Sequence, residues 1–297
     1  MTGEIHPLKK VTVEKVGVKV GERVEVRGMG ESSPIGVFDS GVGGLTIMTE
    51  MLRQLKDENV IYLADTARVP YGGRPPQEII KINHEILDYF VEQGAKMVIM
   101  ACGTSSSIAY PVVKDKYKIP IISLIGPGSR AAVEATRNGK IGLLATIGTV
   151  ESGAYQRAIK ELKPEAEVVA EACPLFVPLI EGGFIEAEET RRVAREYLKP
   201  LLNAGVDTII LGCTHYPHLL KILKEIAGSE VTFIDPAEGA VGEAKGILNK
   251  AGLLNRAGPA GKYEYVVTGS PIQFQDLGSR LLGKPIGAAK LVKLGGS

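Results

Sequence analysis

The sequence predicts an α/β fold of two pseudo-symmetric, doubly wound domains with parallel sheets, with an N-terminal β-hairpin-like extension. Two observations predict this fold. From residue 34 onward, apolar runs of strand length alternate with amphipathic stretches of helical period. The halves also share motifs, because MVIMACGT at 97–104 is matched by TIILGCT at 208–214. Continuous apolar strands separated by helices are typical of parallel sheets covered on both faces.

The first half of the chain supplies four expected strands and two expected helices. Apolar runs predict strands at 35–38, 60–65, 97–101 and 119–125. A helix is expected over 46–55, and a second over 77–94, where Ile79, Ile80, Leu87, Phe90 and Val91 recur at near-helical spacing before Gly94.

The second half repeats this plan. Strands are expected at 141–146, 167–172, 208–212 and 231–235, with a helix over 190–205. Gly36 and Gly142 are 106 positions apart, and Cys102 and Cys213 are 111 apart. This near-constant offset predicts a duplicated α/β unit. We therefore expect one domain of residues 34–125 with 236–297, carrying Cys102, and another of residues 126–235, carrying Cys213.

Both chain ends fall outside this repeat. Valine alternates with polar residues around a glycine over 11–28, which predicts a β-hairpin within an extension of residues 1–33. Residues 30–34, GESSP, are typical of a linker, and the tail LGGS of a frayed end. We expect no catalytic role for either terminus.

Composition limits the class of protein. The chain has 297 residues, 44% of them hydrophobic and 23% charged, as in globular proteins. A formal net charge of +1 gives no reason to expect a nucleic-acid partner. No apolar run approaches the roughly 18 residues that span a membrane, and no secretory signal begins the chain. The three cysteines form no CxxC pair. We therefore expect a cytoplasmic protein with neither disulfides nor a metal site.

Two of the three cysteines stand in matched settings. Cys102 and Cys213 each follow an apolar strand and precede hydroxyl-bearing residues, at the sheet edge where α/β proteins bind ligands. Each is expected at a helix start, with Thr104 and the serines of ACGTSSS as caps, and a helix N-terminus lowers a thiol pKa. A single buried cysteine more often packs as a small hydrophobe. Two in matched places favour chemistry, whereas Cys173 is expected to be structural.

Two further segments are candidate site walls. DSGVGG at 39–44 lacks the glycine spacing of a dinucleotide fingerprint and the lysine of a P-loop, so it is either a tight turn or an anion site offering Asp39 and Ser40. ADTARVPYGGRPP at 64–76 is rich in turn residues, and Asp65, Tyr71 and Arg74 are candidates for a polar ligand. An ordinary solvated loop position is the more natural role for Arg74.

A facing pair of thiols suits one reaction. A thiolate can take a proton from one face of a carbon while a thiol on the opposite face returns one, with no cofactor. Other assignments fit less well. Zinc held by Cys213, His215 and His218 would lack further ligands at clear spacing. A Cys-His hydrolase needs only one cysteine. Motifs for flavin or nicotinamide are absent from the sequence.

Several ordered motifs between about Ile35 and Leu254 carry a family resemblance. They are IGVFDSGVGGL, LADTARVPYGGRP, IMACGTSS, GTVESGAYQ, CPLFVPLIEGG, IILGCTHYP and IDPAEG. Over these segments the chain resembles glutamate racemase, of the cofactor-independent aspartate/glutamate racemase superfamily. The resemblance implies two α/β domains with the active site in the cleft between them. It also implies interconversion of L- and D-glutamate, supplying D-glutamate for peptidoglycan, and a homodimer.

The resemblance also implies roles for individual residues. Cys213 would take the Cα proton of L-glutamate and Cys102 that of D-glutamate, with Asp39 and His215 assisting the adjacent thiols. The implied substrate-binding residues are Asp39, Ser40, Tyr71, Gly72, Gly103, Thr104, Thr214 and His215. Asp65, Thr149 and Glu181 also match the family pattern. No cofactor, metal, nucleic acid or membrane is implied.

Three positions bear on which substrate the chain acts on. The resemblance leads us to expect asparagine after the first cysteine, where this chain has Gly103, and glutamate where it has Gly126. Related aspartate and acyl-amino-acid racemases more often carry glutamate at the position of His215, which favours glutamate as substrate here. A regulatory binding protein, such as a DNA gyrase inhibitor, is the alternative from another class.

Overall fold

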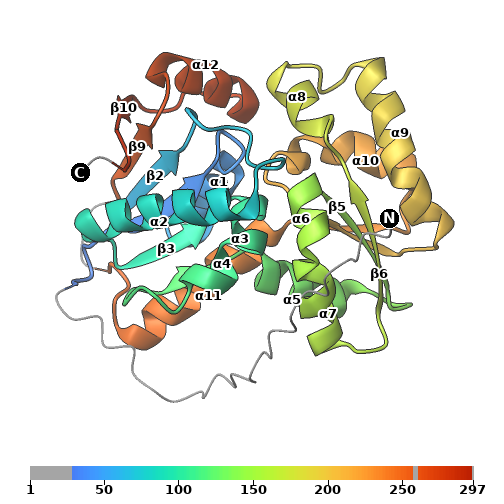
Figure 1. Cartoon of the computed structure of the whole chain (residues 1–297), viewed down its shortest axis with the longest axis horizontal. Coiled ribbons are helices and arrows are strands. Elements are labelled where there is room, and N and C mark those ends of the chain that lie inside the picture. The colour runs from blue at the N-terminus through green and yellow to red at the C-terminus, as the bar shows by residue number, and fades with distance from the viewer. Residues whose placement is uncertain (1–28, 257–259, 296–297) are drawn as a thin grey trace, which may run out of the picture.

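The computed structural model describes residues 29–256 and 260–295, whose elements form two lobes side by side, each around its own parallel sheet (Figure 1). This arrangement confirms the predicted fold class. The β-hairpin expected at 11–28 lies outside the described residues. The predicted domain boundaries near residues 125 and 235 stay predictions.

The first sheet has six strands in the order β10-β9-β2-β1-β3-β4. Their bounds are β1 Ile35–Asp39, β2 Val60–Ala64, β3 Met97–Met100, β4 Ile121–Ile122, β9 Tyr263–Val267 and β10 Ala289–Leu291. All neighbours pair in parallel. The strand expected over 119–125 is reduced to two residues, because Pro120 has no N–H for the ladder and Ile125 already begins a helix. Strands β9 and β10 were not predicted.

The second sheet has four parallel strands in the order β6-β5-β7-β8. Their bounds are β5 Lys140–Ala145, β6 Glu167–Ala172, β7 Thr208–Leu211 and β8 Thr232–Ile234. This order repeats the β2-β1-β3-β4 core of the first sheet. The repeat extends to single residues: a Cβ at Gly36 would collide with the Phe90 ring, and one at Gly142 with Leu201. Each lobe therefore has a glycine in its first strand at the point where a side chain of a covering helix packs directly against the strand.

Helices cover both faces of each sheet (Figure 1). Around the first sheet they are α1 Leu45–Gln54, α11 Pro236–Ala251 and α12 Pro271–Leu282 on one face, and α2 Pro76–Glu92, α3 Gly103–Ile108 and α4 Tyr110–Val113 on the other. Around the second sheet they are α8 Phe176–Glu181, α9 Glu188–Asn203 and α10 Leu220–Ala227 on one face, and α5 Ile125–Ala135, α6 Ile147–Ser152 and α7 Ala154–Leu162 on the other.

The buried face of α2 differs in part from the one expected. Ile79, Leu87 and Phe90 are buried as predicted, but Val91 is 45% exposed and Ile80 lies at the margin of the core. Successive helical residues are separated by about 100°, so Val91 points away from the face that Phe90 defines.

The carboxylate of Asp207, just before β7, closes the loop at 136–138. It accepts hydrogen bonds from Thr136 Oγ1 at 2.7 Å and from the N–H groups of Arg137 and Asn138 at 2.8 Å each. Burial acts to raise the pKa of Asp207, but these hydrogen bonds outweigh it and hold the pKa below its ordinary value.

We expect Asp207→Asn to lower the free energy of unfolding by about 1–3 kcal/mol at pH 7, because hydrogen bonds to a charged acceptor are lost. The difference in the free energy of unfolding between this variant and the parent protein should shrink as pH falls below about 4. In that range Asp207 binds a proton in the unfolded state before it does so in the folded state. Urea unfolding at several pH values measures this difference. Asp115→Asn is the control, since the Asp115 side chain is 84% exposed. An equal loss in both variants would contradict the assignment.

Candidate active site

Cys102 and Cys213 occupy equivalent places in the two lobes. Each lies two residues beyond the end of a strand inside its sheet, Cys102 after β3 and Cys213 after β7. Both line one pocket between the lobes, and the two residues are 5% and 7% exposed. The duplication of the fold therefore brings two thiols to one cavity.

All of the residues to which the family resemblance assigns catalysis or substrate binding line this pocket, whereas Asp65 and Arg74 do not. The residues so assigned are Asp39, Ser40, Tyr71, Gly72, Cys102, Gly103, Thr104, Cys213, Thr214 and His215. Their individual roles stay predictions. The lining also includes Val69, Pro70, Thr146 and Val177, which the sequence reasoning missed. The repeat offset of 106 could have found Thr146, because it equates this residue with Ser40.

Histidine and glutamate lie on the Cys213 side of the pocket. His215 Nδ1 is 3.8 Å from Cys213 Sγ, and His215 Nε2 is 2.9 Å from Glu181 Oε1. Burial acts to lower the pKa of His215, but the hydrogen bonds with Cys213 and Glu181 raise it to about 10. A protonated imidazole held at this place carries positive charge beside the thiol at neutral pH.

The prediction that Cys213 lies at a helix start is wrong. Its strand is followed by a turn and a short 3₁₀ helix, Tyr216–Leu219, before α10 begins at Leu220. His215 therefore supplies the nearby positive charge that the helix N-terminus was expected to supply.

The Cys102 side of the pocket carries a carboxylate. Ser40 Oγ lies 3.9 Å from Cys102 Sγ. Asp39 accepts hydrogen bonds from the N–H groups of Ser40 at 2.8 Å and Gly44 at 2.6 Å, and from Thr214 Oγ1 at 3.2 Å. Asp39 thus reaches Cys102 through Ser40 and contacts the opposite lobe through Thr214.

Cys102 sits at the N-cap of α3 as predicted, but two expectations about it are wrong. Burial, and after it the charge of Asp39, raises the pKa of Cys102 to about 12 instead of lowering it. Desolvation outweighs the short helix, so Cys102 is a neutral thiol at neutral pH. The expected caps are also absent, because Ser106 Oγ donates to Met100 O and Ser107 Oγ to Thr104 O.

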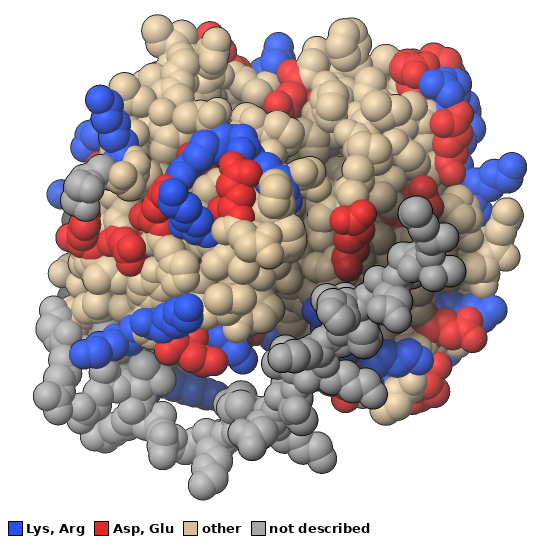
Figure 2. All heavy atoms as spheres, in the orientation of Figure 1, with Lys and Arg blue, Asp and Glu red and all other residues tan. Residues whose placement is uncertain are grey.

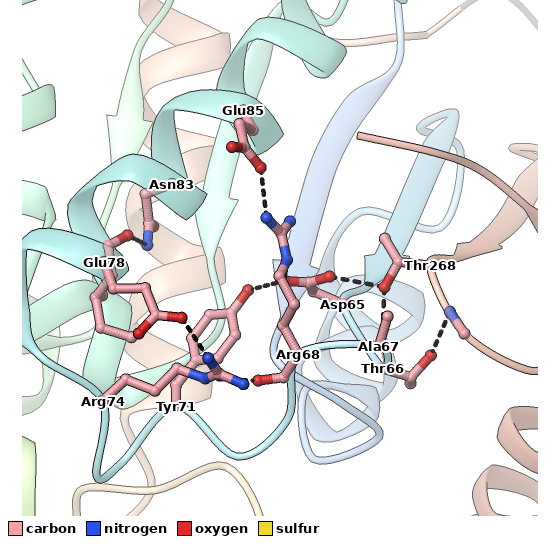
Figure 3. Close-up of polar contacts among 12 residues, drawn as sticks. Asp65, Thr66, Ala67, Arg68, Tyr71, Arg74, Glu78, Asn83, Glu85 and Thr268 are labelled. Atoms are coloured by element: carbon pink, nitrogen blue, oxygen red, sulfur yellow. Dashed lines mark hydrogen bonds and ion pairs between the residues drawn. The ribbon is translucent and has the colours of Figure 1, made fainter. Parts of the chain in front are cut away.

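The loop between β2 and α2 is held from behind by Asp65 (Figure 3). The buried Asp65 carboxylate accepts hydrogen bonds from Tyr71 Oη, from Arg68 Nε at 2.7 Å and from Thr268 Oγ1 at 2.7 Å. Arg68 also pairs with Glu85 on α2. The Tyr71 hydroxyl is therefore used inside the protein, and the tyrosine ring forms part of the pocket wall.

Arg74 lies outside the pocket lining, as the sequence favoured. It pairs with Glu78 and donates to the carbonyl of Arg68 at 2.9 Å (Figure 3). Its interactions support the loop from the α2 side.

Three residues that matched the family pattern each lie directly behind a pocket residue. Asp65 holds Tyr71, and Glu181 holds His215. Thr149 Oγ1 accepts a hydrogen bond of 3.0 Å from Thr146 Oγ1, which also lies 3.0 Å from Thr104 Oγ1 of the other lobe. These contacts fix the side chains that face the cavity.

The surface gives no sign of a polyanion-binding site on the face drawn in Figure 2. Acidic and basic side chains are interspersed there, and neither sign covers a continuous area. Within residues 29–256 and 260–295, no group of three His, Cys, Asp or Glu side chains could hold a metal ion. Among the helices described, none combines the length and the apolar character needed to cross a bilayer.

Comparisons with known proteins identify the family of the chain. A family model described as Asp/Glu/Hydantoin racemase matches residues 35–244. The glutamate racemase of Geobacter metallireducens is 43% identical over 260 residues, covering 88% of this chain and 96% of that protein. The glutamate racemase of Enterococcus faecalis is 39% identical over 270 residues, covering 91% and 99%.

Solved structures share the two-lobed fold. The structure of a glutamate racemase isoform from Bacillus anthracis has a TM-score of 0.85 and 35% identity, covering 89% of this chain and 98% of that one. A glutamate racemase from Francisella tularensis, solved in complex with D-glutamate, has a TM-score of 0.83 and 34% identity with the same coverage. The resemblance found in the sequence is thus confirmed: the chain belongs to the Asp/Glu/hydantoin racemase family, and the relatives named here are glutamate racemases.

Proposed function

We propose that this protein interconverts L-glutamate and D-glutamate by moving a proton between Cys102 and Cys213, without a cofactor. The observation that carries the proposal is the placement of both thiols in one pocket, each at the same point of its own sheet. Similarity to glutamate racemases over about nine-tenths of the chain supports glutamate as the substrate.

The surroundings of the two thiols suit opposite roles. Cys213, acting as a thiolate beside the protonated His215, takes the Cα proton of L-glutamate and forms an S–H bond as the C–H bond breaks. The neutral thiol of Cys102 gives its proton to the opposite face of the carbanion, which leaves Cys102 as the thiolate. The reverse reaction starts from this second state, and proton exchange with solvent restores the first.

The carbanion needs help beyond the thiols, because the Cα–H of an amino acid is a very weak acid. The pocket is lined by hydroxyl groups of Ser40, Thr104, Thr146 and Thr214, which are suited to bind substrate carboxylates. Thr104 and Thr146 come from opposite lobes and are hydrogen-bonded to each other at 3.0 Å. A carboxylate accepting hydrogen bonds from both would hold the lobes closed and exclude water from the reacting carbon.

Proton NMR in D₂O tests the proposed activity directly. Purified protein is mixed with L-glutamate and no added cofactor, and the Cα proton signal is followed together with optical rotation. We expect loss of both signals with L-glutamate and much slower loss with L-aspartate. A stable signal with glutamate would contradict the proposed function, and faster loss with aspartate would reassign the substrate.

We expect Asp65→Ala to raise KM for glutamate about tenfold, or about 1.4 kcal/mol, with a smaller fall in kcat. The change releases Tyr71 and Arg68 and loosens the loop that forms one pocket wall. The contacts of Cys102 with Ser40 and of Cys213 with His215 do not involve this loop. Steady-state kinetics measures the split between KM and kcat. Asp88→Ala, which loses only the hydrogen bond from Tyr117 outside the pocket, is the control. An unchanged KM would contradict the role given to the loop.

The family resemblance also implies a biological setting. D-Glutamate made by this reaction would supply peptidoglycan synthesis, and we expect the protein to act in the cytoplasm. We also expect a homodimer, as the family resemblance implies. Analytical ultracentrifugation checks that state, and a purely monomeric protein would contradict it.

A further inference from the structure

At Gly43, in the DSGVGG turn, there is no room for a side chain. Gly43 does not have a left-handed backbone, so its conformation is open to other residues. A Cβ added there, however, would lie 2.5 Å from Thr214 Oγ1 and would be at least as close to His215 Nδ1. Both side chains belong to the opposite lobe. Gly43 therefore leaves the space in which His215 lies against Cys213.

Two more glycines of the first lobe occupy comparable places, Gly72 in the loop after β2 and Gly103 at the start of α3. A Cβ at Gly72 would lie 3.0 Å from Thr146 Cβ, and the Gly72 carbonyl already accepts a 2.9 Å hydrogen bond from Gly148 N. A Cβ at Gly103 would lie well under 3.0 Å from the carbonyl oxygen of Gly212. The segments that follow β1, β2 and β3 each meet the second lobe at a glycine.

We propose that Gly43, Gly72 and Gly103 are positioning residues that allow the two lobes to close on the substrate, and that Gly43 also sets His215 against Cys213. The kinetic part of this proposal rests on the proposed racemase function. The steric part rests on the packing of the two lobes alone.

The three contacts differ in how the structure could accommodate an added methyl group. At Gly103 the obstacle is a backbone carbonyl, which cannot rotate away, so a methyl group must push the cysteine-bearing loops apart by roughly 1 Å to restore an ordinary contact. At Gly43 the obstacles are side chains, so a methyl group displaces the imidazole of His215. The asparagine that the family resemblance leads us to expect at 103 would need the segments that carry Gly103 and Gly212 to lie farther apart than they do in this chain.

Alanine variants test the proposal with two independent readouts. A misplacement of about 1 Å can lower turnover about 100-fold, which is the fall in kcat expected for Gly103→Ala. Gly43→Ala should lower kcat and change its pH profile, because His215 moves from Cys213. Gly73→Ala is the matched control, since this neighbour of Gly72 has no heavy atom within 4 Å of an added Cβ. It should behave as the parent protein.

The second readout needs no racemase activity. Iodoacetamide alkylation of each cysteine is followed by mass spectrometry in the unliganded protein. In Gly103→Ala we expect faster alkylation of Cys102 and Cys213 at the opened cleft, while Cys173, buried in the second lobe, reacts at the parent rate. Parent rates at both pocket cysteines in Gly103→Ala would overturn the proposal. Equal acceleration of all three would also overturn it, because it would indicate general unfolding.

The two readouts separate this proposal from the proposed function. A parent protein without racemase activity would refute the function, and the alkylation pattern would still decide whether the glycines control closure. If the parent racemises glutamate and both Gly43→Ala and Gly103→Ala keep its kcat and pH profile, the glycines have no positioning role.

Discussion

Replacement of Cys102 by alanine is expected to lower racemisation of glutamate at least about 1,000-fold in both directions, and replacement of Cys213 should do the same. Each direction uses both thiols, one to take a proton and the other to give one, and each such group contributes about 10²–10⁴ in rate. Racemisation has an equilibrium constant of one, so kcat/KM must fall equally in the two directions. Polarimetry from either enantiomer measures the effect.

Cys173→Ala is the matched control for these variants. This third cysteine is also buried, but it does not line the pocket with Cys102 and Cys213, so turnover should stay close to that of the parent protein. Normal racemisation by either Cys102→Ala or Cys213→Ala would contradict the two-thiol mechanism. A hydrolase with one catalytic cysteine should tolerate loss of the other.

Replacement of His215 by asparagine is expected to lower kcat about 100-fold at neutral pH. The variant removes the positive charge beside Cys213 and leaves Glu181 without its partner. Since the pKa of His215 is raised to about 10, parent turnover should persist through neutral pH and fall as pH passes about 10. His215→Asn should lack this fall. A pH profile unchanged by the substitution would contradict the assigned role.

His84→Asn is the control for the histidine substitution. His84 is hydrogen-bonded to Tyr117 in the first lobe, away from the pocket lining. The pH profile of His84→Asn should therefore keep the shape seen in the parent protein.

The same pKa shift has a consequence for folding. A histidine whose folded pKa lies above its unfolded value of about 6.5 contributes stability that is complete below pH 6.5. That contribution is lost as pH rises through the folded pKa of about 10. The stability difference between the parent and His215→Asn should therefore narrow between these values, as urea unfolding would measure.

Most of the fold could be predicted because it depends on local apolar patterns and their repetition. Strands β1, β2, β3, β5 and β7 are continuous apolar runs buried inside their sheets, which is the clearest sequence signal of a parallel strand. The three residues of β10, Ala289–Leu291, carry no such signal, because they pair only at the edge of the sheet. Their pairing depends on the tertiary structure.

The residues of the site could be predicted better than their chemistry. The repeat placed Cys102 and Cys213 at matching sheet edges, and the structure brings them to one pocket. The raised pKa of Cys102 could not be predicted from its place at a helix start. Its causes are the burial of Cys102 and the charge of Asp39, and both depend on parts of the chain that are distant in sequence. The space left by Gly43 is likewise visible only when the two lobes are packed together.

The measurement that tests the two-thiol mechanism most directly is the position of deuterium early in the reaction. Protein in D₂O is given L-glutamate with protium at Cα, and both enantiomers are separated and analysed by mass spectrometry at low conversion. Transfer between two thiols predicts deuterium in nearly all D-glutamate, delivered by Cys102, while the remaining L-glutamate keeps its protium. Protium in the D-glutamate, or equal deuterium in both enantiomers, would indicate a single base and contradict the mechanism.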